Sequence, residues 1–96
     1  MAFSLRIALV YSRARWKVKI RDKETREPPH ATIIHGTRAW RIDLRTGEFM
    51  DSRPDPSEVP TELVNFIRQD DTWQRLRREW DRMYPNNPVT ESEDEG

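Results

Sequence analysis

The segment HATIIHGTRAWRID, residues 30–43, constrains the fold of this chain more than any other. Gly36 and Thr37 fit a two-residue type II′ turn, which takes glycine at its first central position and joins two antiparallel strands. In that register Ile33 lies opposite Trp40 on the neighbouring strand. The apolar face of the predicted hairpin consists of Ala31, Ile33, Trp40, Ile42 and Leu44.

Two further segments alternate apolar and polar residues with the period of a half-buried strand. Residues 16–21, WKVKIR, place apolar side chains on one face and basic ones on the other, and they form the clearest strand signal. Residues 3–11, FSLRIALVY, also alternate. We expect a strand there, with a helix as the alternative, because leucine, alanine and arginine tolerate helical backbone. Thr46 and Gly47 indicate a second turn, after which residues 48–50 can add a short edge strand.

Helical periodicity begins only after the proline-rich segment at residues 51–60. Two apolar stripes follow, and at 100° per residue they point about 100° apart, so a single straight helix would not bury both. We therefore predict two helices with a bend at residues 69–72, where Asp70 or Asp71 serves as an N-cap, and an end at Pro85. The first stripe is Leu63, Phe66 and Ile67, and the second is Trp73, Leu76, Trp80 and Met83.

These patterns predict an α+β fold: a twisted antiparallel sheet of three to five strands with two C-terminal helices packed on one face. A chain of 96 residues forms a single domain, which we place at residues 1–85. Residues 86–96, NNPVTESEDEG, are polar, acidic and without periodicity, so we predict a disordered tail. The expected core residues are Val18, Ile33, Trp40, Leu63, Phe66, Ile67, Leu76 and Trp80.

Both histidines lie in the predicted hairpin, at an odd separation that puts their side chains on opposite faces of a strand. We therefore expect no metal site, and the sequence indicates no cofactor or catalytic residue. A histidine across from a carboxylate resembles part of a general-base arrangement, which leaves a small hydrolase or nuclease centred on His30 and Asp43 as an alternative. A polar cross-strand pair on a solvated sheet face explains the same residues. The candidate polar site is His30, Thr32, Arg41 and Asp43.

The N-terminal half of the chain is basic and the C-terminal half acidic, although the formal net charge is zero. Basic residues at odd positions share one face if residues 13–21 form a continuous strand. Such a face can follow the phosphate backbone of a nucleic acid. The zero net charge argues against that function, and lysines on an edge strand also prevent aggregation. The candidate nucleic-acid-binding residues are Arg13, Arg15, Lys17, Lys19 and Arg21.

The order of these elements, with the motif Pro-Pro-His before the hairpin, resembles a family of small bacterial proteins classed as a domain of unknown function. The hallmark of that family is Pro-Pro-His-x-His after a first strand, and the resemblance covers about residues 16–82. It rests on Pro28, Pro29, His30, Gly47 and Trp80. The second histidine of the motif is Thr32 here, so a role for two histidines on one face does not carry over. Members often look like one half of a toxin–antitoxin-like gene pair, so the resemblance implies a protein partner or a regulatory role.

From these observations we expect a small, non-enzymatic interaction protein that binds a protein partner or itself, with a nucleic-acid-binding module as the alternative. The chain contains no cysteine, which is typical of a reducing compartment. The apolar run near the N-terminus is broken by Arg6 and lacks a cleavage motif, so we predict no signal peptide. No segment reaches the ~20 apolar residues of a membrane span, and we expect a cytoplasmic protein.

Overall fold

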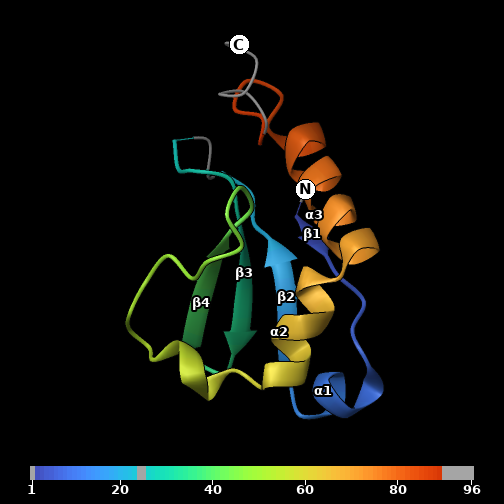
Figure 1. Ribbon diagram of the computed structural model, residues 1–96, viewed down its shortest axis with the longest axis vertical. Helices are drawn as coiled ribbons and strands as arrows, with labels where there is room; N and C mark the ends of the chain where they lie inside the picture. The colour runs from blue at the N-terminus through green and yellow to red at the C-terminus, as the bar shows by residue number, and fades with distance from the viewer. Residues whose placement is uncertain (1, 24–25, 90–96) are drawn as a thin grey trace.

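The computed structural model describes residues 2–23 and 26–89. Its strands are β1 (Phe3–Ser4), β2 (Trp16–Ile20), β3 (His30–His35) and β4 (Arg38–Asp43). Its helices are α1 (Leu9–Arg13), α2 (Thr61–Arg68) and α3 (Asp70–Met83), with a short 3-10 helix at Pro56–Glu58 before α2. The strands form one antiparallel sheet in the order β1-β2-β3-β4, and α2 and α3 lie on one face of it (Figure 1). The predicted α+β architecture is confirmed.

The β3–β4 hairpin forms in the predicted register. Gly36 has a φ of 63°, a left-handed value that glycine adopts without the steric penalty of a Cβ atom. His30 pairs with Asp43, and Ile33 pairs with Trp40. Because side chains alternate along a strand, the predicted apolar face points toward the helices, and all of its residues are buried.

The core lies between the sheet and the two C-terminal helices, as predicted. Gln69 has extended backbone, so α2 ends at Arg68 and α3 begins at Asp70. This break turns the second helix and lets both apolar stripes face the sheet. Asp70 and Asp71 are therefore the first two helical residues, and Gln69, not either aspartate, is the N-cap. Phe66 is half-buried, whereas the other expected core residues, Val18, Ile33, Trp40, Leu63, Ile67, Leu76 and Trp80, are buried. In the described part of the chain, no helix has the length and apolar character needed to cross a membrane.

The predicted strand at residues 3–11 is wrong beyond Ser4. β1 pairs with one end of β2, and the Leu5 N–H donates to the Val18 carbonyl oxygen before the chain leaves the sheet. The helix alternative holds for Leu9–Arg13, where α1 reverses the chain toward β2. The alternation of apolar and polar residues therefore continues past Ser4, where the strand ends. One result is that Leu9, an apolar residue of the pattern, is 65% exposed.

Packed structure continues beyond the predicted domain end at residue 85. The indole N–H of Trp80 donates to the Asn87 carbonyl oxygen at 2.7 Å, and the guanidinium of Arg45 donates to the Val89 carbonyl oxygen at 2.8 Å. Val89 is only 1% exposed. The boundary at residue 85 is therefore too early. The segment after it is polar, but its one buried apolar residue, Val89, packs against the rest of the fold. Residues 90–96 of the predicted tail lie outside the described residues.

Candidate functional site

His30 is buried, and not on a solvated sheet face as predicted. Its side chain is fully inaccessible, and its ring centroid lies 5.5 Å from that of Trp80 on α3. Nδ1 lies 2.8 Å from the Pro28 carbonyl oxygen. A carbonyl oxygen can only accept, so Nδ1 carries the proton that is donated in this bond. The imidazole is thus fixed in orientation by the backbone just before β3.

Asp43 lies opposite His30 in the register, but its carboxylate accepts hydrogen bonds from the backbone of the turn that follows β4. Oδ1 accepts from the backbone N–H of Arg45 at 2.7 Å and of Thr46 at 3.3 Å. Such local bonds are how aspartate commonly builds turns. The predicted pairing of an imidazole with an orienting carboxylate is therefore wrong for these two residues.

Thr32, the third predicted member of the polar site, is also buried. It is 2% exposed and pairs with Lys19 on β2 and with Arg41 on β4. The long side chains of these two neighbours flank it on either side, because directly opposed residues project from the same face of a sheet.

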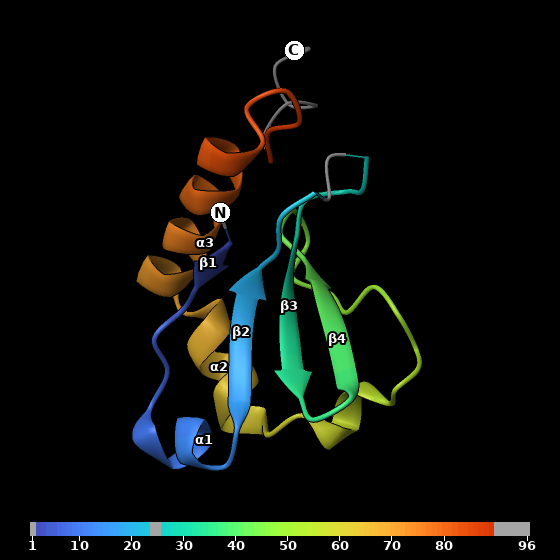
Figure 2. The ribbon, with the colours of Figure 1, turned by 180° about the vertical axis from the view of Figure 1, so that it is seen from behind.

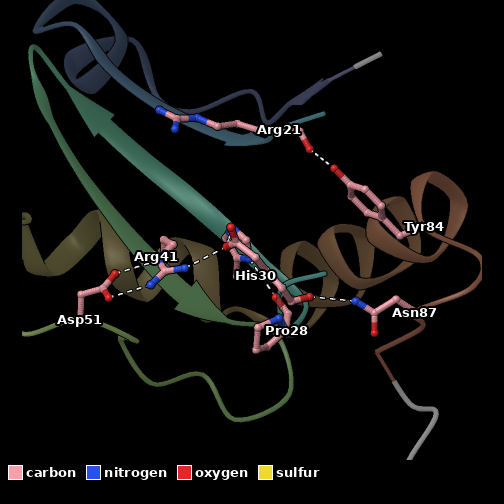
Figure 3. Close-up of polar contacts among 8 residues, drawn as sticks. Arg21, Pro28, His30, Arg41, Asp51, Tyr84 and Asn87 are labelled. Atoms are coloured by element: carbon pink, nitrogen blue, oxygen red, sulfur yellow. Dashed lines mark hydrogen bonds and ion pairs between the residues drawn. The ribbon is translucent and has the colours of Figure 1, made fainter. Parts of the chain in front are cut away.

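Arg41 is the centre of the polar group that does form (Figure 3). Its Nε and Nη2 atoms each donate to one carboxylate oxygen of Asp51 at 2.8 Å, a bidentate arrangement. Its Nη1 atom donates to Oε1 of Glu27 at 2.9 Å, and the same oxygen lies 3.8 Å from Nε2 of His30. The hydrogen bond from Arg41 lowers the pKa of the Asp51 carboxyl below its usual value, and it raises the pKa of the guanidinium.

This polar group joins β4 to the loops on either side of the hairpin. Bidentate arginine–carboxylate pairs fix geometry as well as charge, and the one histidine in the group is closed to solvent. The arrangement is suited to holding loops in place, and its arginine and two carboxylates are partly exposed. Within residues 2–23 and 26–89, no three or more His, Asp or Glu side chains are placed to hold a metal ion.

Sequence reasoning missed Glu27 and Asp51, the two carboxylates on Arg41. Both lie in proline-containing loops without periodicity. The position of Glu27 directly before the two prolines was a local signal for an ordered loop. No local signal showed which arginine it would meet.

The predicted nucleic-acid-binding residues do not share one strand face. Arg13 ends α1, and Arg15 has a φ of 73°, which turns the chain into β2. Lys17 and Lys19 project from the sheet face that lies away from α2 and α3, which Figure 2 shows without a covering helix. Arg21 follows the end of β2. The condition for a shared face, a continuous strand over residues 13–21, is therefore not met, because α1 and the turn precede β2.

In the part of the chain that the structure describes, none of these five basic side chains forms an ion pair or hydrogen bond. Most of the described acidic side chains are used elsewhere: Glu58 pairs with Arg38 and Glu79 with Arg82. The aspartates near chain turns accept from backbone N–H groups, as Asp55 does from Ser57. The five basic side chains at residues 13–21 therefore have no acidic partner among the described residues, although the sequence has as many acidic as basic residues.

A groove with a volume of about 760 Å³ runs between β2 and the segment that precedes it. We call it the edge groove. Three cations and no acidic residue line it. Its lining is Ser4, Leu5, Arg6, Ile7, Leu9, Ser12, Trp16, Lys17, Val18 and Lys19. A second hollow of about 420 Å³ shares Ser12 and Lys17 with it and adds Arg15, so the basic side chains border two adjoining depressions.

The backbone of β2 is open along part of this groove. In an antiparallel ladder, the N–H and C=O groups of alternate residues point to the same side of the strand. The Val18 carbonyl accepts from Leu5 at 2.8 Å, so the backbone groups of Trp16 and Val18 point away from β3. Within residues 2–23 and 26–89, the Leu5–Val18 bond is the last between the N-terminal segment and β2. The Trp16 end of the strand therefore presents unpaired backbone to the edge groove.

No protein-family model, curated protein or solved structure matches this chain. The resemblance to the Pro-Pro-His-x-His family therefore stays a prediction that rests on the residues of the motif. Two of those residues, His30 and Trp80, contact each other in the core. The chemistry of the edge groove has to be inferred from its own residues.

Proposed function

We propose that this chain is a small, non-enzymatic interaction protein that binds a protein partner along the edge groove. One observation carries the proposal: open strand backbone, apolar side chains and unmatched cations meet at a single place. Exposed strand edges are ready templates for pairing with another chain, and natural complexes use them in this way.

The apolar surface beside the groove supports the proposal. Leu9 is 65% exposed and Val10 is 69% exposed, and no residue of α1 is buried. Single exposed hydrophobic residues are normal on a protein surface. Two adjacent ones on the helix that borders an open strand edge form a patch, and a partner gains by covering it.

The resemblance described above supports the same class of function. It implies a protein partner, such as the product of a paired gene, or a regulatory role. We place this activity in the cytoplasm as part of the proposal, because a chain without cysteine has no disulfide that a reducing compartment would break.

Nucleic-acid binding is the second candidate, and the five unmatched cations favour it. Modules that bind single strands also present aromatic faces on which bases stack. Trp16, which borders the basic residues, instead stacks on His35 at 4.1 Å and on Trp40 at 5.6 Å between ring centroids. A hydrolase centred on His30 has no such support, since that side chain is inaccessible.

The proposal is tested by affinity capture from the lysate of the host cell, with and without nuclease. The wild-type chain is compared with the double variant Lys17→Glu/Lys19→Glu. The control is Arg53→Glu/Arg78→Glu, which changes the net charge equally at exposed positions outside the groove. We expect a protein that resists nuclease, is retained by the control and is lost with the groove variant. Capture that is equal for all three chains, or that disappears with nuclease, would contradict the proposal.

A further inference from the structure

On the basis of the proposed function, we propose that the edge groove takes an extended segment of the partner whose residues alternate between acidic and apolar, added to β2 as a new strand. The order of side chains along β2 and the charges that line the groove determine the chemistry of this segment.

The backbone of β2 requires an extended ligand. Trp16 directs its N–H and C=O groups into the groove, and Val18 directs its N–H there as well, since only its carbonyl meets Leu5. A strand placed beside them completes the ladder that β1 begins at Ile20 and Lys19. The N-terminal segment blocks the groove beyond Leu5, so the new pairing covers only the Trp16–Val18 end of the strand.

The side chains of β2 set the alternation. Lys17 and Lys19 project from one face, whereas Trp16 and Val18 project from the other, toward the core. Side chains on paired strands meet on the same face. Within the open stretch, a ligand residue beside Lys17 therefore gains from being acidic, whereas Lys19 lies opposite Ser4 of β1 and only lines the groove. The ligand residues on either side of that acidic one lie near Trp16 and the exposed Leu9, where apolar residues gain.

The charges that line the groove favour this ligand over two others. A second copy of the chain, paired through its own β2, would bring Lys17 and Lys19 close to the same lysines, and like charges on paired strands repel. A nucleic acid supplies negative charge, but it supplies neither strand backbone nor the apolar side chains that match Leu5, Ile7 and Leu9 in the lining. An acidic, extended peptide satisfies the cations, the backbone and the apolar wall together.

The test uses the full chain and a fluorescein-labelled peptide of sequence Glu-Val-Glu-Val-Glu-Val, with binding measured by fluorescence anisotropy. Two comparison peptides keep the same residues: one arranges them in blocks, Glu-Glu-Glu-Val-Val-Val, and one is methylated on the backbone nitrogens of its valines, whose N–H groups would face β2. We expect both comparison peptides, and the Lys17→Glu/Lys19→Glu variant, to bind at least about tenfold more weakly. The Arg53→Glu/Arg78→Glu control should match the wild type within about twofold. Circular dichroism of each variant confirms that it is folded.

Amide hydrogen exchange locates the peptide. The N–H groups of Trp16 and Val18 should exchange more slowly when the alternating peptide is bound. The N–H of Lys17, which faces β3 in the register, should change little and serves as an internal control. Protection confined to Trp16 and Val18 supports strand addition, and unchanged exchange at both overturns it.

The remaining outcomes separate this inference from the proposed function. Equal binding of the alternating and block peptides would show attraction of charge without strand addition and would overturn the inference. A single-stranded DNA oligonucleotide that displaces the peptide, with affinity that falls steeply with salt, would assign the surface to nucleic acid. If the peptide fails while the host protein is still captured through Lys17 and Lys19, the proposed function stands and only the acidic strand is wrong.

Discussion

At the β4 edge of the sheet, Arg41 is bound by two carboxylates. On β2, at the side that β1 leaves partly open and that we call the β2 edge, Lys17 and Lys19 meet no carboxylate among the described residues. The backbone differs in the same way. Residues 48–50 cover β4, where Ile42 and Phe49 form an isolated bridge in place of the predicted short edge strand. On β2, β1 covers only one end.

The difference separates charges that hold the fold from charges that are available to a partner. A paired arginine anchors loops, and removing it leaves carboxylates without their cation. A solvated lysine is stable in water and adds little to folding, but it adds to attraction and specificity when a partner of opposite charge approaches. In this molecule the two kinds of charge lie on the same face of one small sheet, toward its two different edges.

The largest expected contrast lies between two leucines. Leu44 is fully buried beyond the end of β4, and Leu9 is largely exposed beside β2. Leu44→Ala should lower the free energy of unfolding by about 2–5 kcal/mol. Leu9→Ala should change it by less than about 0.5 kcal/mol. Urea unfolding followed by tryptophan fluorescence measures both. A comparable loss at Leu9 would show that α1 packs on the fold in solution, and the β2 edge would then be covered.

A smaller contrast is expected between the cations of the two edges. Arg41→Met removes the partner of Asp51 and Glu27 and should cost about 1–1.5 kcal/mol, since the group is partly exposed and screened. Lys19→Met should lie within about 0.5 kcal/mol of the wild type. Thermal unfolding of both variants at low and high salt is the measurement. A marked loss for Lys19→Met would mean that its charge serves the fold after all.

The pH dependence of the β4 edge gives a third comparison. The pKa of Asp51 is lower in the folded chain than its ordinary value of 3.8, so the pair with Arg41 stabilises the fold above that value, and its contribution is lost as the pH falls through the folded pKa. The free energy of unfolding of the wild type should exceed that of Asp51→Asn by about 0.5–1 kcal/mol near pH 7, and the two should converge once the pH lies below the folded pKa of Asp51. Urea unfolding of both chains at a series of pH values measures this difference. A difference in the free energy of unfolding that is constant with pH would disprove the ionic contribution.

The smallest effect concerns the acidic end of the chain. Deleting residues 90–96 removes Glu91, Glu93, Asp94 and Glu95 and makes the net charge positive. The alternating peptide should then bind about two- to threefold more tightly at low salt, and equally at high salt, because the chain loses four negative charges that repel an acidic peptide and salt screens such repulsion. Anisotropy titrations of both chains provide the measurement. Weaker binding after the deletion would show that these residues support the groove.

The hairpin and β2 can be predicted from the sequence because the information that specifies them is local. Gly36 selects the turn, and the turn sets every pair from His35 outward. Residues 5–11 could not be predicted, since their alternation suits a strand but the sheet has no place for it. One contact that helps to set their path joins Tyr11 to Glu62 on α2, and such a long-range contact leaves no pattern in either segment.

The candidate site was predictable only in its charge. The basic character of residues 13–21 is evident from composition, but the lack of acidic partners depends on where the loops place their carboxylates. Arg41 was correctly included in a polar group, yet its partners come from loops 10 and 14 residues away in sequence. Their paths are determined by tertiary packing and not by local preference.

The contacts made by residues after α3 affect the order in which this molecule can be completed during synthesis. Asn87 donates to the Glu27 carbonyl oxygen, and the hydroxyl of Tyr84 donates to that of Arg21 (Figure 3). These bonds span 60 and 63 positions, whereas the hairpin closes over a two-residue turn. Loop closure becomes more costly as the intervening chain lengthens, so a nascent chain can form the hairpin early. The connection between β2 and β3 gains these donors only after all the strands and helices have left the ribosome.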